Sequence, residues 1–237
     1  MKKKLEICCY SVESALIAES AGADRIELCD NYLEGGTTPS YAAIKQAVDL
    51  LSIPVNVIIR PRGGDFLYSD IEYEIIKNDV IVAKELNANG VVLGFLNEDG
   101  GIDEPKIKEI VRLAKPMEVT FHRAFDMCKD PAIALQQLID AGVKRILTSG
   151  HKDEAINGVE LLAKLVKQAD ENIIIMPGGG VIETNITELI EKTKAIEYHS
   201  SAKLFKRSNM RYFHTSVNMG DSKNLDEFST IIVDAQK

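Results

Sequence analysis

The stretch VTFHRAFD, residues 119–126, ends a β-forming run with three side chains able to do chemistry: His122, Arg123 and Asp126. Histidine titrates near neutral pH and serves as a general acid or base, and arginine is suited to holding a carboxylate or a phosphate. A purely structural ion-pair cluster is the alternative, because such networks also contain groups with shifted pKa values. The position of this stretch in the fold bears on the choice between the two interpretations.

A Glu-x-Cys pattern occurs twice, at Glu6 and Cys8 in LEICCY and at Glu27 and Cys29 in RIELCD. In a strand, residues two apart share a face, so each glutamate points the same way as its cysteine. Adjacent strands lie about 4.8 Å apart, and two inward thiols at similar height could share a soft ion such as Cu(I). A free cysteine is otherwise commonly a small buried apolar residue, and that alternative stays open.

The same alternation assigns further polar side chains to the faces of other β-forming runs. They are Asn56, Arg60, Arg62, Thr120, His122, Glu197, His199 and Ser201. Buried charges need partners, so we expect Arg60 to neutralise Glu6 or Glu27. Such pairing would fit a structural network as well, but the convergence of several polar groups from different strands favours a functional site.

Three consecutive glycines, Gly178, Gly179 and Gly180, follow the apolar run at residues 173–176. The backbone N–H groups of such a loop can bind a phosphate, whereas the structural alternative is a turn in which glycine supplies a positive φ. The segment RPRGGD, residues 60–65, adds two arginines and a flexible acidic loop. Arg62 in that loop is either part of an anion clamp or a solvated charge.

These residues lie in a regular alternation of short β-forming runs and longer amphipathic segments. The β-forming runs are LEICCY, RIELCD, VNVIIRPR, GVVLGFLN, MEVTFHRAFD, RILTSG, NIIIMPGGG and AIEYHSSA. Helix starts are marked at Ser11, Thr38 and Asp130, and helix ends at Gly22 and Gly142. Eight β–α units in a chain of 237 residues predict an α/β fold, a single (β/α)8 TIM barrel domain over residues 1–237.

An open doubly wound sheet is the alternative fold, but no GxGxxG motif follows the first run. After the eighth run we expect a long polar loop at residues 203–224 and a terminal helix near residues 225–235. In TIM barrels the functional groups lie at the C-terminal ends of the strands, and phosphate commonly binds after strands seven and eight. His122, Arg123 and Asp126 therefore belong at the mouth of the barrel, together with the three glycines.

Charge and cysteine content argue against several classes of protein. The chain has 28 Lys and Arg against 36 Asp and Glu, a net charge of −8, with no basic run beyond residues 2–4. We therefore expect neither nucleic acid nor a membrane as a partner. Four cysteines do not form a disulfide framework, and the apolar run after MKKK is too short for a signal peptide. Both observations predict a cytoplasmic protein with free thiols.

The remaining cysteines and histidines are assigned no functional role. Cys9 has the opposite parity to Cys8, so we expect it to pack beneath a helix. Cys128 has no obvious partner in the sequence. His151 and His214 lie in loops, where we expect them to be solvated.

Several motifs together carry a family resemblance. They are ADRIELC, GGTTPS, IRPRGGDFLYS, VTFHRAFD, LTSG, MPGGGV and the HSSA that ends the eighth run. From residue 5 to beyond residue 202 the chain resembles the CutC family of copper homeostasis proteins, which have a TIM-type barrel. The resemblance implies a cytoplasmic homo-oligomer, a dimer or tetramer, that handles copper. It also implies a Cu(I) site with one cysteine from each of the first two strands, which match Cys8 and Cys29.

The first functional hypothesis is therefore a copper homeostasis protein that binds Cu(I) through Cys8 and Cys29. The alternative is an enzyme that acts by acid–base chemistry on a small anionic metabolite, with or without a phosphate. In this alternative the catalytic residues are Glu27, Arg60, His122 and Asp126, and the ligand-binding residues are Arg62, Arg123, Gly178, Gly179, Gly180, His199 and Ser201. A hard divalent ion on Glu27, His122 and His199 is a weaker variant. A structural ion-pair network is the third hypothesis.

Overall fold

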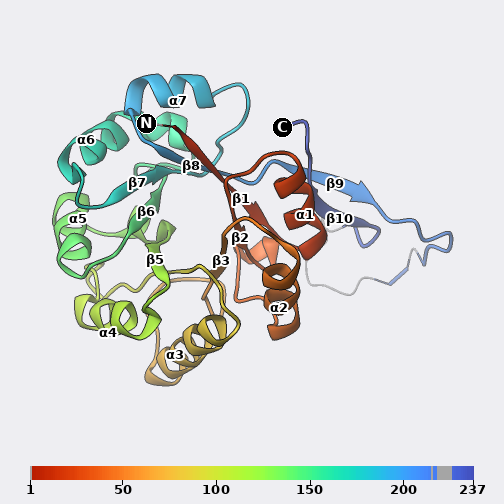
Figure 1. Cartoon of the computed structure of the whole chain (residues 1–237), viewed down its shortest axis with the longest axis horizontal. Helices are drawn as coiled ribbons and strands as arrows, with labels where there is room; N and C mark the ends of the chain where they lie inside the picture. Colours follow the sequence, from red (N-terminus) through yellow and green to blue (C-terminus); the bar gives the residue numbers. More distant parts are fainter. Residues whose placement is uncertain (1, 215, 218–225) are drawn as a thin grey trace.

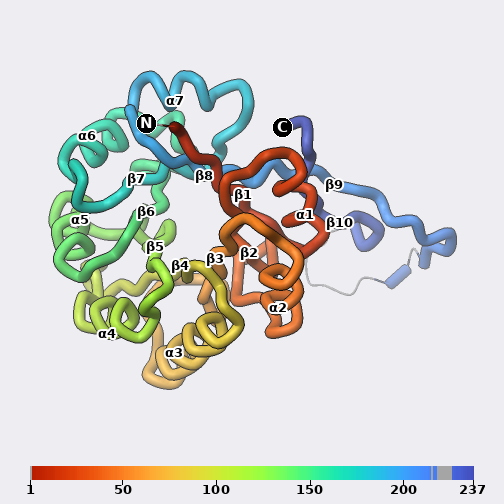
Figure 2. The backbone as a smooth tube through the Cα atoms, in the orientation of Figure 1, coloured from red at the N-terminus to blue at the C-terminus, as the bar shows by residue number. Residues whose placement is uncertain are grey.

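The computed structural model describes residues 2–214, 216–217 and 226–237, and it contains a nearly closed barrel of eight parallel strands (Figure 1, Figure 2). The strands are β1 (Lys4–Cys9), β2 (Arg25–Leu28), β3 (Val55–Ile58), β4 (Gly90–Leu93), β5 (Glu118–Phe121), β6 (Arg145–Thr148), β7 (Ile174–Pro177) and β8 (Glu197–Ser200). The helices are α1 (Val12–Ser20), α2 (Tyr41–Leu50), α3 (Asp70–Glu85), α4 (Glu104–Ala114), α5 (Pro131–Asp140), α6 (Val159–Ala169) and α7 (Ile186–Thr193), with short 3-10 helices η1 (Tyr32–Glu34), η2 (Arg123–Met127) and η3 (Ala155–Gly158). The predicted (β/α)8 barrel is confirmed.

The strand order is β7-β6-β5-β4-β3-β2-β1-β8, and β7 and β8 close the ring by contact, without a hydrogen-bonded ladder in the described residues. Register within the ring places Glu6 of β1 beside Arg25 of β2 and beside His199 of β8. A glycine is needed after β7, because a Cβ on Gly178 would collide with Cδ1 of Leu147 in β6 and would lie 3.0 Å from the Cβ of His199 in β8. Gly178 thus leaves room for these two side chains of the neighbouring strands.

The helices begin at capping residues, mostly where the sequence places them. The Ser11 hydroxyl accepts a backbone N–H in the first turn of α1, and the Asp130 carboxylate accepts two N–H groups at the start of α5. Helix α2 follows Ser40, two residues later than Thr38 predicts. The Thr38 hydroxyl instead accepts the backbone N–H of Arg60 at 3.0 Å, so this residue holds a loop at the end of β3.

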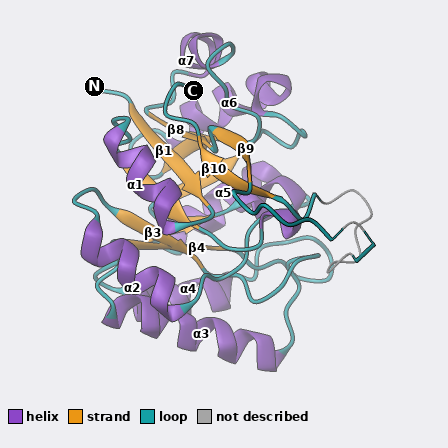
Figure 3. Ribbon diagram, turned by 90° about the vertical axis from the view of Figure 1, so that its right-hand side faces the viewer, coloured by secondary structure: helices purple, strands orange, loops and turns teal. Residues whose placement is uncertain are grey.

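The chain after β8 differs from the prediction. Strands β9 (Lys203–Arg207) and β10 (Ser229–Val233) form an antiparallel hairpin, so the terminal helix expected at residues 225–235 is wrong, and the expected loop begins with a strand. The residues Thr230, Ile231, Ile232 and Val233 are β-branched in succession, which favours a strand over a helix. The hairpin contacts α1 and extends away from the barrel (Figure 1, Figure 3). Residues 215 and 218–225 of the expected loop and helix lie outside the described residues.

The main apolar core lies between the wall of the barrel and the surrounding helices. Outward-facing strand residues such as Ile26, Val57 and Phe121 are buried in it. Cys9 is buried in the same core, whereas Cys8, one residue earlier, belongs to a separate small cluster, as their opposite parity predicts. The inward faces carry polar side chains, and these build the candidate site. No helix among the described residues is long and apolar enough to cross a bilayer.

Candidate functional site

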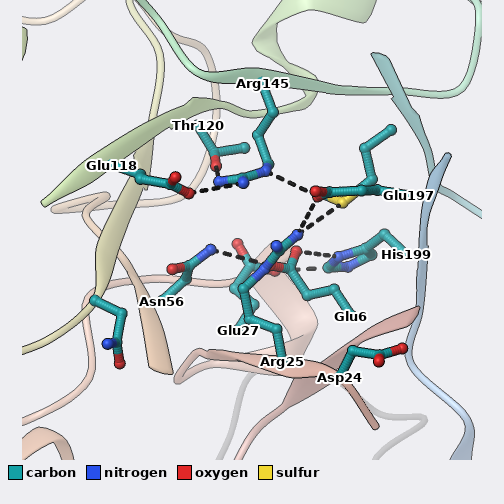
Figure 4. Close-up of polar contacts among 12 residues, drawn as sticks. Glu6, Asp24, Arg25, Glu27, Asn56, Glu118, Thr120, Arg145, Glu197 and His199 are labelled. Carbon is teal, nitrogen blue, oxygen red and sulfur yellow. Dashed lines mark hydrogen bonds and ion pairs between the residues drawn. The ribbon is translucent and has the colours of Figure 1, made fainter. Parts of the chain in front are cut away.

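A network of charged side chains fills the interior of the barrel near the N-terminal ends of its strands (Figure 4). The Arg25 guanidinium forms ion pairs with Glu6 and, at 2.7 Å, with Glu197. Arg145 pairs with Glu197 at 3.0 Å and with Glu118 at 2.7 Å. All of these groups except Glu118 are buried. Because buried charges are tolerated only when paired, this alternation of cations and anions stabilises the polar interior.

The prediction that Arg60 neutralises Glu6 or Glu27 is wrong. Arg60 lies two residues beyond the end of β3, nearer the mouth than the layer that holds Glu6. Its guanidinium donates hydrogen bonds to three backbone carbonyls, those of Glu34 at 2.5 Å, Gly36 at 2.8 Å and Gly64 at 2.9 Å. Arg60 therefore holds together the loops that follow β2 and β3.

His199 connects the charged network to the mouth of the barrel. Its Nδ1 lies 2.9 Å from Glu6 Oε1, and its Nε2 lies 3.5 Å from Glu27 Oε2. Burial lowers the pKa of His199, but hydrogen bonds to Cys8 and Glu6 outweigh burial and raise the pKa well above its usual value. For Glu6 burial acts in the opposite direction and raises the pKa, but His199 and Arg25 outweigh burial and lower this pKa to about 2. His199 and Glu6 therefore form an imidazolium–carboxylate pair.

Cys8 and Cys29 face each other inside the barrel, at the ends of β1 and β2. Their Sγ atoms are 3.5 Å apart, and both side chains are buried beside Ile58. The hydrogen bond from Cys29 lowers the pKa of Cys8 well below its usual value and outweighs burial, while burial raises the pKa of Cys29. These opposite shifts favour ionisation of Cys8 over Cys29.

Glu27 lies next to the two thiols. One of its carboxylate oxygens and the two Sγ atoms all lie within 4.8 Å of one another. Burial, followed by the charge of Cys8, raises the pKa of Glu27 well above its usual value. A protonated carboxyl in such a place is suited to giving up a proton, as a general acid does.

His122 follows the last residue of β5 and is buried against the ring of Phe66, with a centroid distance of 4.9 Å. Its Nδ1 accepts the backbone N–H of Ala124 at 3.2 Å. Burial and the nearby charge of Arg60 lower the pKa of His122 to about 3, so the imidazole is neutral. With Nδ1 acting as an acceptor, the proton sits on Nε2. This Nε2 is buried and has no hydrogen-bond partner among the described residues.

Asp126 and Arg123 are tied to the loop that follows β6. Asp126 accepts hydrogen bonds from the Thr148 hydroxyl at 2.5 Å, the Ser149 N–H at 3.0 Å and the His151 N–H at 3.2 Å. The Nε of Arg123 donates to Asp126 at 2.8 Å, and its Nη2 donates to the Ser149 hydroxyl at 2.9 Å. These contacts make Asp126 a residue that orients Arg123 and this loop.

Arg62 is held by neighbours in its own loop and in α3. It pairs with Glu72 at 2.5 Å and with Asp65 at 3.1 Å, and its guanidinium lies 5.0 Å from the ring centroid of Tyr68. Strand alternation predicted that Arg62 shares a face with Arg60. However, β3 ends at Ile58, and side chains alternate between two faces only within a strand.

A cavity of about 640 Å³ opens where the C-terminal ends of the strands meet, and it unites most of the predicted site. The predicted residues that line it are Cys8, Glu27, Cys29, Arg60, His122, Arg123, Gly179, Gly180, His199 and Ser201. Arg62, Asp126 and Gly178 do not line it. Tyr10, Phe66 and Lys203 also line the cavity and were not selected from the sequence.

The sequence analysis did not select Arg25 and Arg145, the two arginines of the buried network. The signal was available, because Arg25 lies two residues before Glu27 and therefore shares its inward face. It also missed a contact between Cys128 Sγ and His151 Nε2, which are 3.6 Å apart. The expectation of a solvated His151 fails, since its side chain is partly buried against Cys128 and Phe125.

Comparisons with known proteins identify the family. The model of the CutC family matches residues 3–204. The chain belongs to the CutC family. A family protein CutC from Parabacteroides distasonis is 50% identical, with 100% of this chain and 98% of the relative covered. A protein of Homo sapiens named copper homeostasis protein cutC homolog is 46% identical, with 98% of this chain and 85% of the relative covered.

Solved structures agree with this CutC assignment. The crystal structure of CutC from Streptococcus agalactiae matches with a TM-score of 0.80 at 35% identity, covering 84% of this chain and 98% of that chain. The aldolase QR15 matches with a TM-score of 0.64 at 14% identity, covering 84% of this chain and 89% of that chain. The second likeness concerns the barrel fold alone.

Proposed function

We propose that this member of the CutC family serves copper homeostasis by binding Cu(I) through Cys8 and Cys29. The observation that carries the proposal is the pair of buried Sγ atoms, 3.5 Å apart at the bottom of a cavity. The name of the human relative, copper homeostasis protein cutC homolog, supports the same role.

The donor atoms fit the chemistry of Cu(I). Thiolates are soft ligands that select Cu(I), and the hydrogen bond from Cys29 lowers the pKa of Cys8, which favours its ionisation as the first ligand. Cys29 would lose its proton on binding, because a thiol must be deprotonated to act as a ligand. Both cysteine side chains are buried, so little of either sulfur is exposed to solvent.

The test is an anaerobic Cu(I) titration against a competing chelator. We expect the Cys8→Ser, Cys29→Ser double variant to bind Cu(I) more than about 100-fold more weakly, since even changes outside the ligand set cost about 10–100-fold in metal affinity. Cys9→Ser is the matched control, because it removes a buried thiol one residue away that faces the outer core. Equal affinity of the parent and the double variant would refute the two-thiol site.

A second candidate function is an enzyme that uses acid–base chemistry on a small anionic molecule. Its supporting observation is the cavity itself, which at about 640 Å³ is far larger than a metal ion requires and falls in the range of small-molecule sites, about 300–1,000 Å³. Glu27, as a protonated carboxyl, and His122, as a neutral imidazole, would supply the acid–base groups.

Hydrogen exchange tests this second candidate. Small carbonyl-containing acids incubated with the protein in D2O should gain deuterium at the carbon next to the carbonyl, as measured by NMR. The exchange should fall at least about 100-fold in Glu27→Gln, the usual scale of a general acid–base contribution. It should persist in the Cys8→Ser, Cys29→Ser variant, whereas exchange that survives Glu27→Gln would count against this function.

A further inference from the structure

The loop after β7 presents three consecutive backbone N–H groups that have no acceptor in the described ranges. Gly179 and Gly180 have φ values of 92° and 69°, in the left-handed region. No group in the described part of the chain accepts a hydrogen bond from the N–H groups of residues 179–181. Their carbonyls, in contrast, accept hydrogen bonds from the Ala155 N–H at 2.8 Å, the Asn185 amide at 2.8 Å and the Ser200 hydroxyl at 2.7 Å. The loop is therefore held by its oxygens and leaves its N–H groups free.

Successive N–H groups in this conformation form a concavity that binds anions. The Arg123 guanidinium lies directly beside it, with its carbon 3.1 Å and its Nη1 3.2 Å from the position a Cβ on Gly179 would take. Nε and Nη2 of Arg123 are occupied by Asp126 and Ser149, which leaves Nη1 available. A fixed positive charge thus adjoins the free N–H groups.

The buried Nε2 of His122 is independent evidence for a ligand in the same cavity. An unpaired buried donor lowers stability, and His122 is only 5% exposed. Both His122 and the loop line the one cavity. An oxygen atom of a bound molecule would satisfy this donor.

All of these groups are donors, and their number indicates the class of ligand. A phosphate monoester has three terminal oxygens as strong acceptors and a charge near −2 at neutral pH, whereas a carboxylate has two oxygens and one charge. Three N–H groups with an adjacent guanidinium match the phosphate better. Two carboxylates lie close to the loop: Glu154 packs against Gly180 without lining the cavity, and Glu183 lines the cavity two residues beyond the loop.

We propose that the cavity binds a small phosphate monoester, with its phosphate on the N–H groups of residues 179–181 beside Arg123 and an organic oxygen on Nε2 of His122. The inference rests on the second proposed function and names the substrate class of that function. It is separate from Cu(I) binding, which uses the sulfurs deeper in the barrel.

Binding to the full chain is measured by calorimetry with glycerol 3-phosphate, inorganic phosphate, glycerol and malonate. We expect both phosphate compounds to bind and glycerol and malonate to bind at least tenfold more weakly. Gly179→Ala should weaken both phosphate compounds at least tenfold. Gly22→Ala is the matched control, since Gly22 has a similar φ of 96° and open space around its Cβ position, far from the cavity lining. It should leave binding unchanged.

Two further variants keep the test decisive if Gly179→Ala does not fold. Arg123→Gln should weaken both phosphate compounds, and His122→Asn should weaken glycerol 3-phosphate alone. Absence of phosphate binding, malonate binding as tight as phosphate, or equal losses in Gly22→Ala would each overturn the phosphate site. Because no reaction is measured, failure here with persistent deuterium exchange would leave the second proposed function standing.

Discussion

Replacing Arg25 with methionine is expected to lower the free energy of unfolding by about 3–5 kcal/mol, the usual cost of breaking a buried ion pair from one side. Arg25 is the only described cation that contacts both Glu6 and Glu197, and both carboxylates are buried. Its loss leaves Glu6 with His199 as its one charged partner among the described residues. Methionine keeps most of the volume of the side chain, so the expected loss reflects charge and not a large cavity. Denaturant unfolding of the variant and the parent measures it.

Lys192→Met is the matched control for Arg25→Met. Lys192 forms an i,i+4 pair with Glu188 on the exposed surface of α7, at 2.6 Å. Exposed pairs of this kind contribute about 0.3–0.5 kcal/mol, so this variant should be nearly as stable as the parent. The double variant Arg25→Met, Glu6→Gln should recover part of the loss, because it removes one of the uncompensated charges. A loss below about 1 kcal/mol in Arg25→Met would show that the network is dispensable.

Acid is expected to destabilise the protein by about 3 kcal/mol through Glu6 alone. The pKa of Glu6 is about 2 in the folded protein against an ordinary value of 4.5. A lowered carboxyl pKa gives stability that is present above pH 4.5 and is lost as the pH falls toward 2. A difference of about 2.5 pKa units corresponds to about 3 kcal/mol. The free energy of unfolding, measured at intervals between pH 5 and pH 2, should show this loss.

The loss of stability at acid pH can be assigned to Glu6, because the contribution of Glu27 changes in a different pH range. The pKa of Glu27 is raised by burial, so its contribution changes only above pH 4.5, where the unfolded chain ionises. Glu197 also contributes to the loss of stability at acid pH, as Glu6 does. Burial raises the pKa of Glu197, but Arg145 and Arg25 outweigh burial and lower it. Glu6→Gln should therefore flatten the decline between pH 4.5 and pH 2 without abolishing it. A decline of the same size in Glu6→Gln would rule out Glu6 as its main source.

The sequence alone determined the barrel and most of the residues inside it. Eight β-forming runs of fixed spacing, each followed by an amphipathic segment, leave few ways to bury their apolar faces except a closed parallel barrel. Strand alternation then placed Cys8, Glu27 and His199 inward, because the side-chain period of a strand is two. These assignments need only local rules, which the amino-acid order carries directly.

The partners of the buried charges were decided only by the tertiary structure. Parity fixes the face on which a side chain lies, but not its height in the barrel, which depends on strand register and tilt. Glu6 lies beside Arg25 and His199 because of the register of β1 with β2 and β8, and Arg60 lies too near the mouth to reach it. Arg62 also lies past the end of β3, where alternation no longer predicts the face of a side chain, and it pairs with Glu72.

Loop conformation was the other property that the sequence left open. The sequence predicts either a turn or a phosphate-binding loop for the glycines at residues 178–180, and in the folded protein these glycines have different roles. Gly178 leaves room for Leu147 and His199, whereas Gly179 and Gly180 have left-handed backbones and N–H groups that no described residue accepts, beside Arg123. This division depends on contacts with β8 and with the loops after β5 and β6, which are distant in sequence. Local composition therefore specifies which residues reach the mouth of the barrel, and only packing across the barrel specifies what each of them touches.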